Sequence, residues 1–106
     1  MIIAFQSTRI RELCEDPDAA DEVMGHTIAE VFRDRLADVR AAASVEDLIV
    51  GNPRPNGTDG QFLQISLGAE KSIVLEANHL KPIRDADGRV DWRSVSYVKV
   101  IEVAGL

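Results

Sequence analysis

A long apolar stripe after position 16 constrains the fold of this chain most. Apolar side chains recur there every three or four residues, which is the repeat of one face of an α-helix: Ala20, Val23, Met24, Ile28, Val31, Phe32, Leu36 and Val39. Asp16 followed by Pro17 is a typical helix start, because Asp caps free N–H groups and Pro suits the first turn. Gly25 and Thr27 weaken the middle of the pattern, so we expect the helix to bend or break there.

Three segments in the second half of the chain are predicted as β-strands, residues 61–67, 71–77 and 94–103. The first and the last show the two-residue alternation that is typical of strands. Gly68-Ala69-Glu70 predicts a tight turn that joins the first two strands in a hairpin. The stretches 51–60 and 78–92 are rich in Pro, Gly, Asn and Asp, which predicts loops.

The segments at the beginning of the chain complete the expected order of elements. Met1–Gln6 predicts a short strand, Ser7 is placed to cap a short helix through Cys14, and residues 44–47 predict one helical turn. Helices therefore precede most strands. This order favours an α+β fold in which an N-terminal strand and two helices pack on one small antiparallel sheet. A chain of 106 residues is one ordinary domain, so we expect a single domain over residues 1–106.

The net charge of −6 belongs wholly to the first half of the chain. Residues 1–50 carry 5 basic and 11 acidic side chains, whereas residues 51–106 carry 7 of each. Acidic side chains gather at the expected start of the long helix, where they suit the positive end of the helix dipole. This balance argues against a strong non-specific nucleic-acid binder, which usually shows a basic face.

The sequence also argues against several other classes of protein. Cys14 is the only cysteine, so we expect no internal disulfide and no cysteine-based metal site. His26 and His79 lie far apart and lack the spacing of metal ligands, so we expect no metal and no other cofactor. No apolar run approaches the length of about 20 residues that a membrane helix needs. The apolar first residues lack the features of a signal peptide, which predicts a cytoplasmic protein.

Three side chains are the candidates for chemistry on a phosphate. Arg54 lies between two prolines that hold it extended and exposed, and Lys71 begins a predicted strand. Both carry charges that can hold a phosphate. His79 is the acid–base candidate in that half of the chain. Solvated surface charge is the plainer interpretation of Arg54 and Lys71, and a polar loop residue is the plainer interpretation of His79.

Four segments along the chain together resemble a known family. They are Met1–Phe5, Arg11–Pro17, Leu36–Ala42 with Ser44–Leu48, and Asp87–Val95, of which the last has the pattern D-G-x-x-D-W-x-x-V. In this order they resemble the HigB-type branch of the RelE/ParE superfamily of bacterial toxin–antitoxin toxins. The resemblance implies a ribosome-dependent endoribonuclease that cleaves mRNA through the RNA 2′-hydroxyl, with acid, base and cationic groups around the phosphate. It also implies a helix-turn-helix antitoxin as partner.

The same resemblance implies that the catalytic end of the chain has changed. Family members commonly carry Arg where this chain has Ser72, and many end in Asp-Tyr-His where it has Gly105 and Leu106. Glycine and leucine side chains cannot transfer protons.

Three hypotheses remain open from the sequence. The first is a HigB-like toxin whose residual ribonuclease activity uses Arg54, Lys71 and His79 as catalytic residues. The second is a non-catalytic member that keeps its antitoxin-binding surface. The third is a poison of DNA gyrase, as in the ParE branch.

Overall fold

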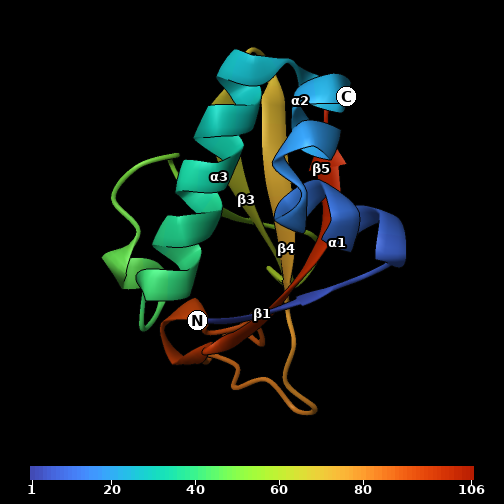
Figure 1. Ribbon diagram of the computed structural model, residues 1–106. Coiled ribbons are helices and arrows are strands. Elements are labelled where there is room, and N and C mark those ends of the chain that lie inside the picture. The colour runs from blue at the N-terminus through green and yellow to red at the C-terminus, as the bar shows by residue number, and fades with distance from the viewer.

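The computed structural model describes residues 1–106 and consists of a helical layer packed on a sheet (Figure 1). The helices are α1 Thr8–Glu15, α2 Pro17–Met24 and α3 His26–Ala41. The strands are β1 Ile2–Phe5, β2 Arg54–Asn56, β3 Phe62–Gly68, β4 Lys71–Ala77 and β5 Tyr97–Ala104. Two short 3-10 helices, η1 Val45–Asp47 and η2 Trp92–Ser94, lie between them. The predicted α+β class is confirmed, and none of the helices has the length and hydrophobicity to span a bilayer.

The apolar stripe breaks at Gly25, as expected, into two helices, so the helical layer has three members instead of the predicted two. The start is as predicted, because the Asp16 side chain accepts a 3.0 Å hydrogen bond from the Asp18 N–H. Gly25 ends α2 and begins α3 with a φ of +79°, a left-handed conformation that glycine adopts without steric cost. The chain turns at this residue, and the stripe continues on α3 with buried Phe32 and Leu36.

The sheet is mixed, which corrects the prediction of an antiparallel sheet. Its strand order is β1-β5-β4-β3-β2. The last four strands along the chain pair antiparallel, whereas β1 runs parallel to β5, with Ile3 opposite Val98. Alternation in the sequence reports which residues share a face and carries no information on strand direction.

A short edge strand, β2, lies within the stretch predicted as a loop. Arg54 pairs with Gln64 and Pro55 with Leu63. Proline lacks the N–H that a central strand needs, so an edge is the place in a sheet that tolerates it. The composition of residues 51–60 therefore predicted the turns on either side of β2. It did not predict that Arg54, Pro55 and Asn56 pair with β3.

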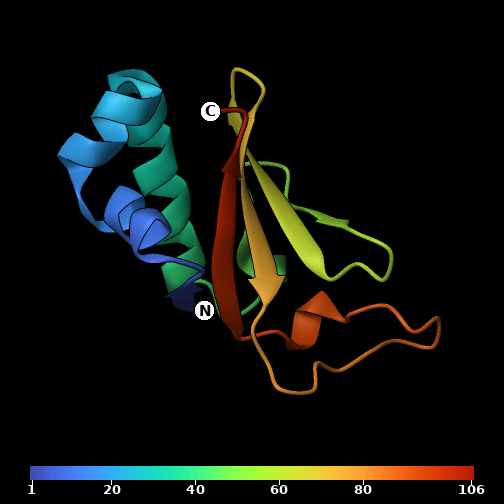
Figure 2. The same ribbon diagram turned by 90° about the vertical axis from the view of Figure 1, so that its right-hand side faces the viewer.

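The core lies between the helices and one face of the sheet (Figure 2). The alternation predicted for residues 61–67 is confirmed on β3, since Leu63, Ile65 and Leu67 are all buried. In β5 the predicted alternation holds up to Val100 and then shifts by one residue. A bulge causes the shift, because Leu75 pairs with Val100 while the preceding residue of β4 pairs with Glu102.

Candidate functional site

The sheet face that the helices leave uncovered is the candidate functional site. Figure 2 shows the helical layer on one side of the sheet, with the β2–β3 connection and the long connection from β4 to β5 on the other side. Paired residues of neighbouring strands share a face. One row across this face consists of Arg54, Gln64, Val74 and Glu102.

A short chain of hydrogen bonds holds polar side chains beside Arg54. The Gln64 Nε2 donates to the Ser72 Oγ at 2.8 Å, and the Asn56 Nδ2 donates to the Gln64 Oε1 at 3.4 Å. Ser72 is buried, whereas Arg54 is exposed and forms no salt bridge. The guanidinium of Arg54 is therefore free to bind an anion from solution.

Lys71 lies apart from Arg54, on the other face of the sheet. It is the first residue of β4, and alternation gives it the same face as Ile73 and Leu75. Both of those side chains are fully buried in the core beneath the helices. Arg54 shares the opposite face with Gln64, so the sheet separates the two cations that the sequence suggested for one phosphate.

His79 lies beyond the far end of β4 and has a structural contact of its own. Its Nε2 accepts hydrogen bonds from the backbone N–H groups of Ser96 at 3.1 Å and Tyr97 at 3.3 Å. Its ring also packs edge-on against the Tyr97 ring, with 5.3 Å between centroids. The strand between Lys71 and Ala77 alone spans about 20 Å. The three candidate residues thus form no common cluster, and none of them lines either surface hollow of the molecule.

The long connection after β4 is clamped to the β2–β3 connection. The Arg84 Nη1 lies 2.7 Å from the Asp59 Oδ2 and 3.0 Å from the Gly88 carbonyl oxygen. The hydrogen bond from Arg84 holds the pKa of Asp59 below its ordinary value. Similarly, hydrogen bonds from Arg93 lower the pKa of Asp91. These two arginines are neutralised within the chain, which leaves a less basic surface than the sequence suggests.

The contact between Arg84 and Asp59 was not predicted, because the two residues are far apart in the chain. Arg84 and Asp59 are separated by 25 positions, and the backbone N–H of Val90 donates to the Asp59 carbonyl oxygen at 2.9 Å. The only part of this region that the sequence analysis singled out is the stretch with Gly88 and Trp92, which belongs to one of the four resembling segments.

Beyond Glu102, the C-terminal end of β5 brings no further ionisable group to the polar row. Ser72 pairs with Ala104, and Gly105 follows with a φ of +87°. A Cβ atom added at Gly105 would meet the Glu70 carbonyl oxygen below contact distance and the Lys71 Cα at 3.2 Å. The end of the chain is therefore packed against the β3–β4 hairpin, and the positions compared with the family's Arg and Asp are filled by small residues.

A comparison with known proteins found no matching family model, no similar curated protein and no similar solved structure.

Proposed function

We propose that this chain is a HigB-like member of the RelE/ParE superfamily, the toxin component of a type II toxin–antitoxin system. In this proposal its exposed sheet face descends from that of an mRNA endoribonuclease. Its present activity is binding, with a helix-turn-helix antitoxin as its partner. The four resembling segments support the proposal, together with the order of an opening strand, helices, a hairpin and a last strand.

The surroundings of Arg54 are the observation that favours binding over cleavage. Its neighbours on the exposed face are Asn56, Gln64 and Ser72, none of which exchanges a proton readily near neutral pH. The carboxylate in the same row is Glu102, three strand spacings or about 14 Å away between backbones.

Cleavage of RNA through its 2′-hydroxyl needs an acid, a base and cations within hydrogen-bond distance of one phosphate. Arg54 and Lys71 lie on opposite faces of the sheet, and the Nε2 of His79 is occupied by two backbone donors. An isolated arginine among amides can hold an anionic group without reacting with it. This arrangement supports recognition as the role of the face.

Induced expression in a bacterial host tests the proposal. We expect growth to continue and cellular mRNA to remain intact. We also expect a gene for a helix-turn-helix protein beside that of this chain, and a stable complex between the two purified proteins. Arg54→Ala is the matched variant, because it removes the guanidinium from the uncovered face of the sheet.

Other outcomes would contradict the proposal in different ways. Growth arrest with cut mRNA that Arg54→Ala abolishes would establish a ribonuclease. Inhibition of DNA supercoiling by gyrase would place the protein in the ParE class. No complex with the neighbouring helix-turn-helix protein would exclude antitoxin binding.

A further inference from the structure

The two edges of the sheet differ in how well they are protected from pairing with another strand. The β2 edge is three residues long and contains Pro55, which has no N–H to donate. Arg54 adds a charge to it, and short length, charge and proline are features that keep sheet edges unpaired. The β1 edge, Ile2–Phe5, contains no charged residue and no proline. It is therefore the edge that stays open to a further strand.

The outward backbone groups of β1 have no backbone partner within the chain. The N–H groups of Ile2 and Gln6 donate toward β5, to the carbonyl oxygens of Ser96 and Val100, both at 2.9 Å. Successive residues of a strand direct their backbone groups to opposite edges, so those of Ile3 and Phe5 point out of the sheet. β1 pairs only with β5, and no other backbone group bonds to these two residues.

The space beside these groups is open. A surface hollow of about 430 Å³ is lined by β1 and the start of α1, with residues Ile3, Ala4, Phe5, Ser7, Thr8 and Arg11. The Arg11 guanidinium lies over the Phe5 ring, 5.4 Å from its centroid, and 3.7 Å from the Glu15 carboxylate. Phe5 pairs with Val100, which is buried beneath the helices, so Arg11 lies on the helical side of β1.

We propose that the β1 edge pairs with the β1 edge of a second copy of this chain, which joins the two sheets into one. A two-fold axis through this contact makes the paired strands antiparallel. With the axis at Ala4, Ile3 of each copy lies opposite Phe5 of the other. Each Ile3–Phe5 pair then exchanges two hydrogen bonds, so every outward backbone group of both strands finds a partner.

The side chains of β1 suit this self-pairing. Ala4 would face its own copy at a position without hydrogen bonds, where the Cα atoms of antiparallel strands approach to about 4.5 Å. Its methyl group fits this close approach. Ile3 would lie beside Phe5 of the second copy, and an aromatic residue beside a β-branched one is a favourable cross-strand pair. Both side chains are half-buried against the core and would be covered further.

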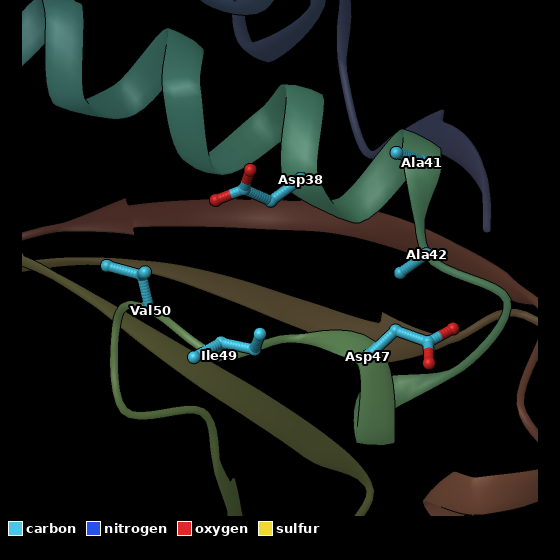
Figure 3. A pocket seen from close by; sticks show the side chains of 6 residues that line it. All are labelled: Asp38, Ala41, Ala42, Asp47, Ile49 and Val50. Atoms are coloured by element: carbon cyan, nitrogen blue, oxygen red, sulfur yellow. The ribbon is translucent and has the colours of Figure 1, made fainter.

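Sedimentation of the native chain from micromolar to millimolar concentration tests the pairing. We expect the weight-average mass to rise from 11.6 kDa toward twice that value. Ala4→Lys should stay monomeric throughout, because like charges would meet directly opposite each other. Ile49→Lys is the matched control and should dimerise like the native chain. Ile49 is 91% exposed and lines the other surface hollow, between α3 and the segment after η1 (Figure 3).

Disulfide trapping tests the position of the two-fold axis. Each chain carries Cys14→Ala, so that the introduced cysteine is the only one. Ala4→Cys should form a covalent dimer on mild oxidation, because Cα atoms about 4.5 Å apart suit a disulfide. Ile2→Cys is the control, since Ile2 is more exposed but would lie about 13 Å along the strands from its copy. It should cross-link at least tenfold more slowly.

Three results would overturn the inference, with circular dichroism showing that each variant is folded. They are a native chain that remains monomeric at millimolar concentration, a dimer that Ile49→Lys dissociates, and equal cross-linking of Ala4→Cys and Ile2→Cys. A monomeric native chain would leave the β1 edge to an extended segment of another protein. These measurements contain no antitoxin and no RNA, so their outcome is independent of the proposed function.

Discussion

The indole Nε1 of Trp92 donates a 2.6 Å hydrogen bond to the carbonyl oxygen of Gly60, which lies 32 positions earlier in the chain. Trp92 is buried, so this bond is shielded from water. It joins the two connections on the uncovered side of the sheet, close to the ion pair between Arg84 and Asp59. The two connections beside the candidate site are thus held together by the Trp92–Gly60 hydrogen bond and the Arg84–Asp59 ion pair.

Replacing Trp92 by Phe should destabilise the fold. The substitution keeps an aromatic ring but removes the donor and leaves the Gly60 carbonyl without its partner. We expect a loss of about 1–3 kcal/mol in the free energy of unfolding, measured by urea denaturation with circular dichroism. Tyr97→Phe is the control, since Tyr97 is exposed at the surface and should change stability by less than about 0.5 kcal/mol. A Trp92→Phe chain as stable as the native one would show that the bond contributes nothing.

The Asp59–Arg84 ion pair should make stability depend on pH in the acidic range. A hydrogen bond from Arg84 lowers the pKa of Asp59 in the folded chain below its ordinary value of 3.8. The stabilisation is therefore present above that value and is lost as pH falls through the folded pKa. We expect native chain to be more stable than Asp59→Asn at pH 6, with the difference shrinking toward pH 3. In an Arg84→Met background, the same comparison should show a smaller pH dependence.

The elements with strong local signals were predicted well. Ser7 caps α1 by accepting from the Ile10 N–H, Asp16 and Pro17 start α2, and the hairpin turn lies at residues 68–70. These features depend on residues within one turn of each other, which a sequence displays directly. The position of the helix break was also predicted, because Gly25 disfavours a continuous helix.

The features that were wrong or missing depend on distant contacts. The parallel pairing of β1 with β5 and the bulge after Val100 arise from how strands meet, as does the pairing of Arg54 with Gln64. The candidate residues Lys71 and His79 were grouped by charge and chemistry alone. Lys71 faces away from Arg54 because Arg54 pairs with Gln64, and the backbone N–H of Ser96 donates to the His79 ring. Both contacts join distant segments, so the sequence alone does not display them.

The thiol of Cys14 should react slowly in the folded chain. Burial raises its pKa from 9.0 to about 12, with a smaller opposing effect of the Arg40 charge. The thiolate is the reactive form, so its fraction at pH 8 falls by about three orders of magnitude relative to a thiol of ordinary pKa. We expect negligible reaction with Ellman's reagent at pH 8 and rapid reaction in 8 M urea. Equal rates in both conditions would contradict the packing of Cys14 against the core.

A chain in which Asp-Tyr-His replaces Gly105 and Leu106 should be less stable than the native chain. Gly105 has a φ of +87°, and its added Cβ would meet the Glu70 carbonyl oxygen. We expect Gly105→Asp to cost about 2 kcal/mol or more, measured by thermal and urea unfolding, from strain and crowding together. Leu106→Tyr should change stability by less than about 0.5 kcal/mol, because Leu106 is exposed.

A pair of alanine variants separates backbone strain from crowding at this turn. Gly68 has a φ of +85°, nearly that of Gly105, but nothing lies within 4 Å of its added Cβ. Gly68→Ala should therefore cost only the strain of about 1 kcal/mol, and Gly105→Ala should cost clearly more. Equal losses would mean that the chain end can move away from the hairpin at Glu70. In that case an Asp at position 105 could be accommodated without crowding the Glu70 carbonyl oxygen.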